Sequence, residues 1–193
     1  MIKQVLLITA LTTTSAYAGM FGNIDYTYYD GVGDSSGYDA NAYSLNLGGK
    51  VYDTKLDSVT LDVRTEFQDI VDTNASVNQL EGGANYQYNI NNDWGVYGRL
   101  GLGNNWVNDI GKNNFSYYSL EPGVKWYPNS NSSVGLAYRF RDSFDTADEY
   151  QTSTFRLNGE YSFDGTNSIQ AGVDTSIGDI EYNAFKVGYM VRF

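Results

Sequence analysis

Residues Phe185 to Phe193 read FKVGYMVRF. Every second residue of this segment is apolar or aromatic, and the residues between them include the cations Lys186 and Arg192. A period of two residues is typical of a β-strand that presents one apolar face and one polar face. The segment therefore predicts an amphipathic strand at the end of the chain.

The same alternation recurs along the chain, and no sustained period of 3.6 residues interrupts it. Taking the apolar face as the outward face, it is clear in residues 59–67, 119–126, 133–141 and 155–163. Further strands fit near residues 21–29, 41–51, 77–89, 94–104 and 167–175. Together these segments predict ten strands.

The connections between the strands alternate in length. Tight turns are expected at residues 52–56, 90–93, 128–131 and 164–167, and longer polar loops at 30–39, 68–75, 108–114 and 142–149, with a shorter one at 176–179. Short turns at one end and longer loops at the other are typical of outer-membrane barrels.

The chain has too many outward apolar residues, many of them aromatic, for the small core of a soluble sandwich or barrel. In a membrane barrel lipid covers that face, and closure leaves no unpaired strand edge in hydrocarbon. We predict an all-β, closed, antiparallel, up-and-down transmembrane barrel of about ten strands, with twelve and eight as alternatives. Aromatic girdles at the two membrane interfaces are expected from Tyr26, Tyr28, Trp94, Trp126, Tyr127 and Tyr150.

Residues 1–18 resemble a secretory signal peptide. Lys3 precedes an apolar stretch from Val5 to Leu11, and Ala16-Tyr17-Ala18 forms a small-x-small cleavage site. Residues 19–193 would then be the mature barrel. The chain contains no cysteine, so disulfides contribute nothing.

The alternation of the last strand is similar to the C-terminal signal that Gram-negative outer-membrane barrels present to the barrel assembly machinery; its residues here are Phe185, Val187, Tyr189, Val191 and Phe193. Residues 23–26 (NIDY), 120–124 (LEPGV) and 135–139 (GLAYR) resemble the oligogalacturonate-specific and sialic-acid-specific porin family. The resemblance implies a small channel for acidic sugars lined by basic residues. Members of that family have twelve strands, whereas the pattern here gives ten.

The residue inventory argues against other function classes. Outer-membrane barrel enzymes resemble one another in using a catalytic histidine, and the chain has none. Without histidine or cysteine a transition-metal site is not expected, and no cofactor is predicted. The net charge of −11 argues against nucleic acid as a partner. We expect a non-enzymatic protein.

The inward face carries many charges. Its nine expected cations are Lys50, Arg64, Arg99, Lys125, Arg139, Arg141, Arg156, Lys186 and Arg192. Its seven expected acids are Asp25, Asp62, Glu66, Glu81, Glu121, Glu160 and Asp174, which leaves the lumen at +2. The first four strands carry −2 and the last six +4, so we expect a transverse electric field across the lumen.

Two functions remain open on this evidence. One is a porin-like channel for passive diffusion of small solutes, with Arg64, Arg99, Arg139, Arg141 and Arg156 as a basic wall and Glu66, Glu81 and Glu121 opposing it or pairing with it. The other is a closed barrel whose interior is plugged by salt bridges. The channel is favoured by inward glycines that would leave free volume, namely Gly48, Gly83, Gly101, Gly123, Gly135, Gly172 and Gly188.

A closed barrel would act as an adhesin or receptor through its loops, which are strongly acidic. They carry Asp30, Asp34, Asp39, Asp69, Asp72, Asp109, Asp142, Asp145, Asp148, Glu149 and Asp179, with Lys112 as their cation. The expected surroundings are outer-membrane lipid and lipopolysaccharide, and the expected state is a monomer.

Overall fold

The computed structural model describes residues 19–35, 39–108, 114–144 and 150–193, so the predicted signal peptide lies outside the described residues. The ten strands are β1 (Met20–Gly31), β2 (Ala40–Asp53), β3 (Asp57–Ile70), β4 (Ser76–Asn89), β5 (Trp94–Asn108), β6 (Phe115–Asn129), β7 (Ser132–Ser143), β8 (Gln151–Ser162), β9 (Asn167–Gly178) and β10 (Tyr182–Arg192). A short 3-10 helix, η1 (Gly33–Ser35), follows β1. No helix among the described residues is long and apolar enough to cross a membrane.

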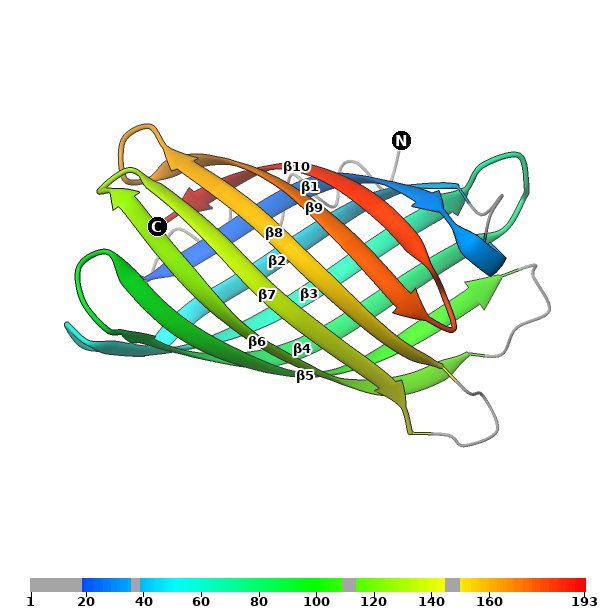
Figure 1. The fold of residues 1–193 in the computed structure, drawn as a ribbon, viewed down its shortest axis with the longest axis horizontal. Coiled ribbons are helices and arrows are strands. Elements are labelled where there is room, and N and C mark those ends of the chain that lie inside the picture. The colour runs from blue at the N-terminus through cyan, green and yellow to red at the C-terminus, as the bar shows by residue number, and fades with distance from the viewer. Residues whose placement is uncertain (1–18, 36–38, 109–113, 145–149) are drawn as a thin grey trace.

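The strands form one closed antiparallel barrel. Each strand pairs with its neighbours in sequence, and β1 pairs with both β2 and β10 (Figure 1). At the seam the Gly19 N–H donates to the Phe193 carbonyl at 2.9 Å, and the Phe193 N–H donates to the Met20 carbonyl at 2.8 Å. The predicted ten-stranded, up-and-down, all-β barrel is confirmed. Closure leaves no free sheet edge, which is what a sheet in hydrocarbon requires.

Both prolines of the chain lie in β6, where the ladder to β7 is interrupted. Leu120 pairs with Phe140 and Gly123 with Ala137, so Glu121 and Pro122 have no register partner on β7. The register is unchanged across that gap, and it shifts between Trp126 and Asn129, around Pro128. Proline has no N–H to donate to a ladder, so interruptions at these positions are expected.

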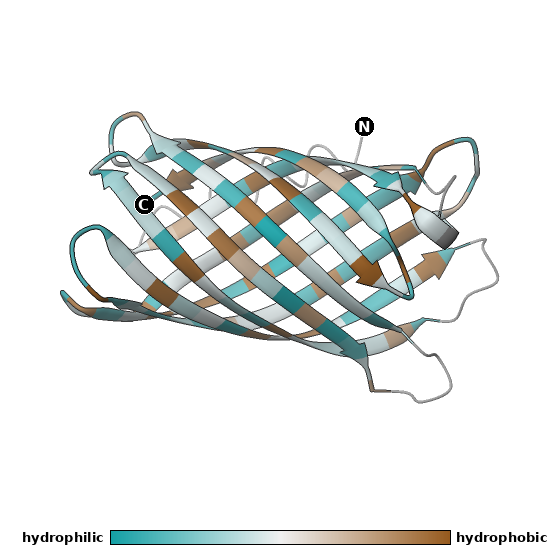
Figure 2. Cartoon of the chain, in the orientation of Figure 1, coloured by the Kyte–Doolittle hydropathy of each residue, from teal (hydrophilic) through white to brown (hydrophobic). Residues whose placement is uncertain are grey.

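The strands alternate between an apolar outer face and a polar inner face (Figure 2). In β5, Leu100 and Leu102 are 63% and 64% exposed, whereas Arg99, which directly precedes Leu100, is only 2% exposed. Side chains on a strand point alternately to opposite faces, so one parity meets the surroundings and the other fills the lumen. An outward face this apolar suits lipid rather than water.

The two ends of the barrel differ. One end, which we call the turn end, carries the connections at residues 54–56, 90–93, 130–131 and 163–166 and both ends of the described chain. The other, the loop end, carries η1, the connections at 71–75 and 179–181, and the strand ends at Asn108, Phe115, Ser143 and Gln151 (Figure 1). At the turn end, hydrogen bonds from Asn167 and from the Thr166 N–H hold the pKa of the Asp164 carboxyl below its usual value.

Four of the six residues predicted for the aromatic girdles lie on the outer parity. Trp94 and Trp126 stack at the turn end with ring centroids 6.2 Å apart, and the Tyr26 ring lies 5.4 Å from Tyr43 nearer the loop end. Tyr28 has the same parity as Tyr26, and its hydroxyl contacts Asp39 at 3.3 Å.

Two girdle predictions were wrong. Tyr127 faces the lumen, where its hydroxyl accepts a hydrogen bond from Gln87 at 2.8 Å. Tyr150 faces inward against Phe115, with centroids 4.5 Å apart. The reason is parity: Tyr127 follows the outward Trp126 directly, so it must point the other way.

Candidate functional site

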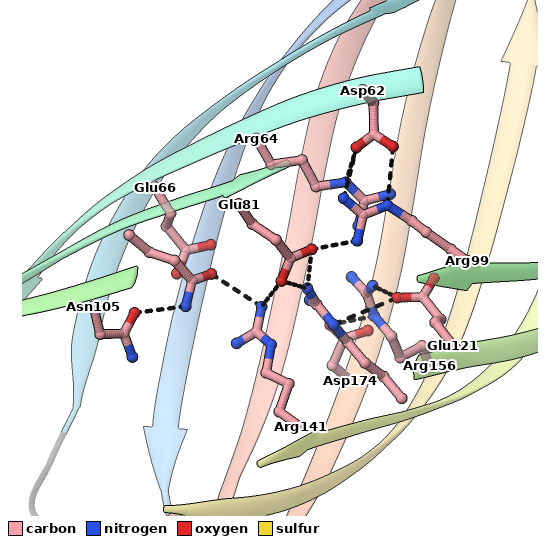
Figure 3. A network of polar contacts seen from close by, with 12 residues as sticks. Asp62, Arg64, Glu66, Glu81, Arg99, Asn105, Glu121, Arg141, Arg156 and Asp174 are labelled. Atoms are coloured by element: carbon pink, nitrogen blue, oxygen red, sulfur yellow. Dashed lines mark hydrogen bonds and ion pairs between the residues drawn. The ribbon is translucent and has the colours of Figure 1, made fainter. Parts of the chain in front are cut away.

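A network of buried ion pairs crosses the lumen between β3 and β9 (Figure 3). We call it the arginine network; it comprises five cations and four acids, namely Arg64, Arg99, Arg139, Arg141, Arg156, Asp62, Glu81, Glu121 and Asp174. Seven consecutive strands contribute to it, and β10, β1 and β2 do not. It therefore ties together one side of the barrel interior.

Glu81 is the centre of this network. Its carboxylate, only 1% exposed, pairs with Arg99, with Arg139 at 2.7 Å and with Arg141 at 3.7 Å. These three arginines come from β5 and β7, so Glu81 on β4 makes contacts across the lumen as well as to its neighbouring strand. Charge-assisted hydrogen bonds of this kind are among the strongest polar contacts in proteins.

The remaining acids pair with the same arginines or with their neighbours. Asp62 receives two hydrogen bonds from the Arg99 guanidinium, at 3.0 and 2.8 Å, and lies 3.1 Å from Nε of Arg64. Arg156 bridges Glu121 at 2.8 Å and Asp174 at 3.1 Å. Every arginine of the network thus has at least one acid within ion-pair distance.

The sequence left open whether the inward acids oppose the arginines or pair with them. Glu81 and Glu121 pair with them. The predicted basic wall is therefore paired, since the five cations of the network lie within ion-pair distance of its four acids. Glu66 differs, because its carboxylate accepts a hydrogen bond from the Tyr29 hydroxyl at 3.0 Å and makes no ion pair among the described residues.

The expectation that inward glycines leave free volume was wrong for six of the seven. A Cβ added at each of these six would lie within 2.6 Å of a neighbouring side chain. The covering side chains are Phe21 over Gly48, Arg99 over Gly83, Ser119 over Gly101, Tyr97 over Gly123, Asn158 over Gly172 and Asp25 over Gly188. Only at Gly135 is the nearest atom as far as 3.8 Å. The glycines make room for large inward side chains from adjacent strands.

This arrangement predicts that alanine destabilises the barrel at one of two adjacent glycines and not at the other. Gly83→Ala should push the Arg99 guanidinium away from Asp62 and Glu81, because the new methyl group would overlap it. We expect a loss of about 1–3 kcal/mol in the free energy of unfolding, the usual cost of overpacking. Gly82→Ala is the matched control, since nothing lies within 4 Å of its added Cβ. Denaturant unfolding in lipid vesicles measures both, and equal stabilities would contradict the account.

Beside the network lies a cavity of about 320 Å³ to which all ten strands contribute lining residues. The walls formed by β1 and β2 carry short polar side chains: Asn23, Asp25, Ser44 and Asn46. Asp25 is held there by hydrogen bonds from Asn23 at 2.8 Å and from Ser44 at 3.4 Å. Amide side chains from other strands add to the polar lining, namely Gln79, Asn85, Gln87, Asn158 and Gln170.

Two lining cations stand outside the ion pairs. Among the residues that the structure describes, neither Lys125 nor Lys186 has an acid within 4.0 Å. Lys125 lies 5.5 Å from the centre of the Tyr127 ring. The other two predicted cations are paired near the turn end, Lys50 with Asp53 at 3.0 Å and Arg192 with Glu160.

Four of the five outward residues predicted as an assembly signal lie on β10, and Phe193 follows its end. Phe185, Val187 and Tyr189 are 57%, 58% and 46% exposed. Val191 and Phe193 share their parity. Their role in recognition by the assembly machinery stays a prediction.

Within the described ranges, no group of three or more histidine, cysteine, aspartate or glutamate residues is placed to hold a metal ion.

The fold is that of outer-membrane β-barrels. No family model and no curated protein matches the chain. Among solved structures it is similar to the COG4313 outer membrane channel from Pseudomonas putida F1, with a TM-score of 0.59, 10% identity, and coverage of 93% of this chain and 97% of that one. It is also similar to the β domain of the Bordetella autotransporter BrkA (0.54, 11% identity, 91% and 99%) and to the KdgM porin (0.52, 14% identity, 89% and 99%).

At these identities the likeness shows the fold alone. The narrower resemblance to the oligogalacturonate-specific and sialic-acid-specific porins is not confirmed. Because a channel, a porin and an autotransporter domain share the architecture, the function of this chain has to be argued from its own lumen.

Proposed function

We propose that this protein is a narrow porin-like channel in the outer membrane of a Gram-negative bacterium, through which small polar solutes and ions diffuse passively. The observation that carries the proposal is the polar cavity of about 320 Å³ inside the closed barrel. Its walls combine amides, hydroxyls and charges, which keep a lumen hydrated. The arginine network fills part of the interior and leaves this space beside it.

The size of the cavity limits what can pass. Liquid water takes about 30 Å³ per molecule, so the space corresponds to roughly ten waters. A space of this size holds small ions and small polar molecules and is too small for larger solutes. Sugar acids are candidate solutes only at the small end of their range.

The two unpaired lysines are the groups that a passing anion would meet. Lys125 on β6 and Lys186 on β10 line the cavity, and the arginines of the network are already engaged by acids. The unpaired acids Asp25 and Glu66 are also on the wall and keep their negative charge, since their hydrogen-bond donors are neutral, but the lining as a whole holds more cations than acids. We propose that the lysines give the channel a modest preference for anions.

This preference is testable by charge reversal. The double variant Lys125→Glu/Lys186→Glu should move the reversal potential in a salt gradient toward cation selectivity, because two fixed positive charges on the wall become negative. The matched control is Lys50→Glu/Lys55→Glu, which changes the net charge equally at exposed positions of the turn end. Equal shifts in the two variants, or none, would remove the lysines from the pathway.

A second candidate is a non-conducting surface barrel, and the extent of the arginine network favours it. Its binding surface would be the acidic loop end, where the described acids include Asp30, Asp39, Asp69, Asp72, Asp142 and Asp179, while the side chain of Asp34 lies outside the described part of the structure. The other predicted loop charges, Asp109, Lys112, Asp145, Asp148 and Glu149, lie outside the described residues. Recording from the folded protein separates the candidates, because this second function needs no conduction.

A further inference from the structure

Aromatic side chains gather inside the barrel at the loop end. Tyr29 on β1, Phe115 and Tyr117 on β6, Tyr182 on β10, and Tyr150 just before β8 all face inward. The Tyr29 and Tyr182 rings meet edge to face at 5.0 Å, and Phe115 lies 4.5 Å from Tyr150 and 6.4 Å from Tyr117. We call these five residues the aromatic layer.

The layer extends toward the opposite wall through an apolar cluster. Tyr29 packs against Ala40, Ile70 and Ala75, which are 0%, 7% and 4% exposed. These three residues belong to β2, to β3 and to the connection that follows β3. Aromatic and apolar side chains therefore approach from both sides of the lumen at this level, above the polar interior.

The cavity ends beneath this layer, and on β1, β6 and β8 the buried side chains of Thr27, Ser119 and Thr154 lie between the two. Arg141, Gln79, Glu66 and Lys186 line it toward the loop end, and none of the five aromatic residues does. The Arg141 guanidinium lies 5.1 Å from the centre of the fully buried Tyr117 ring, so the two levels are in contact. In the other direction the lining reaches Phe21, Lys125 and Met190, close to the turn end.

From this geometry we infer that the aromatic layer is the main barrier to permeation, and that the cavity exchanges solutes mainly with the turn-end side. An apolar constriction resists ions because it excludes the water that hydrates them. The inference rests on the proposed channel function for its consequence in transport. The asymmetry of access to the cavity stands independently of that function.

The access asymmetry can be tested with cysteine labelling, because the chain has no native cysteine. Asn158 on β8 lines the cavity and lies outside the arginine network. With Asn158→Cys, a membrane-impermeant thiol reagent should react slowly in intact cells, where it reaches the loop end, because outer-membrane barrels place their longer loops outside the cell. It should react several-fold faster after the outer membrane is permeabilised to expose the turn end. Equal labelling rates before and after permeabilisation would overturn the inference. This test leaves the aromatic residues unchanged.

Removing the layer should abolish the asymmetry. In the Asn158→Cys background, Tyr150→Ala/Tyr182→Ala should raise labelling from the loop end to the turn-end rate. The control Tyr118→Ala/Tyr138→Ala removes two tyrosines from the outer face, which are 36% and 37% exposed, and should leave the asymmetry intact. The inference fails if the two double variants behave alike. Heat-shifted gel mobility checks that each variant is folded.

Conductance distinguishes this inference from the proposed function. If wild-type barrels conduct, Tyr150→Ala/Tyr182→Ala should raise the unitary conductance several-fold, and an unchanged value would overturn the inference while the channel function stands. A second outcome is that neither the wild type nor the double variant conducts, while labelling is slow from the loop end in the wild type and fast in the variant. That outcome would support the barrier and contradict the channel function.

Discussion

Replacing Glu81 with glutamine should destabilise the barrel more than any other single neutralisation of an inward acid. Arg99, Arg139 and Arg141 share this carboxylate, which is only 1% exposed. Without it, three guanidinium groups are confined together with less negative charge to compensate them. Removing one partner of a buried ion pair typically costs about 3–5 kcal/mol. Denaturant unfolding in lipid vesicles measures the loss.

Glu66→Gln is the control for this substitution. Glu66 also faces the lumen, but its described contact is a hydrogen bond from the Tyr29 hydroxyl, which the amide oxygen of glutamine can still accept. A neutral hydrogen bond contributes only about 0.5–1.5 kcal/mol, so the control should lose less than about 1 kcal/mol. If the two variants unfold at the same free energy, the arginine network does not hold the barrel together as described.

A second large effect is expected at the outer face. Leu102 lies near the middle of β5 and is 64% exposed, so Leu102→Arg would place a guanidinium near the bilayer midplane. The expected cost is about 2–4 kcal/mol, falling to about 0–1 kcal/mol near the interfaces. Val96, on the same strand and the same face close to the turn end, supplies the depth control as Val96→Arg. Unfolding free energies of equal size would show that β5 does not cross hydrocarbon.

The barrel itself could be predicted from sequence because alternation is a local signal. In the last strand, the apolar and polar residues of FKVGYMVRF assign each side chain to a face. Closure followed from the need to pair every strand edge in lipid. Girdle positions failed where proximity to a strand end was weighed above parity, as for Tyr127.

The pairing inside the lumen could not be predicted. Glu81 and Arg139 are 58 residues apart and lie on β4 and β7, which are not neighbours in the sheet. Their contact depends on the stagger between strands and on the barrel radius, and neither is a local property of the sequence. The role of the glycines could not be predicted for the same reason, because the space over Gly83 is filled by the Arg99 side chain from the next strand.

The aromatic layer was missed for a different reason. Tyr117 is two residues before the inward Ser119, so parity alone places it in the lumen. No role was predicted for it, because aromatic residues near strand ends, such as Tyr150, were assigned to the girdles. Applying parity strictly to every aromatic residue near a strand end would have found Tyr29, Tyr117 and Tyr182.

The central claim is that the closed barrel keeps a path for small solutes beside its arginine network. Single-channel recording of residues 19–193 in a planar lipid bilayer tests it most directly, with folding verified by heat-shifted gel mobility. We expect discrete conductance steps of small unitary size. Folded protein that inserts and gives no steps at any applied voltage would contradict it.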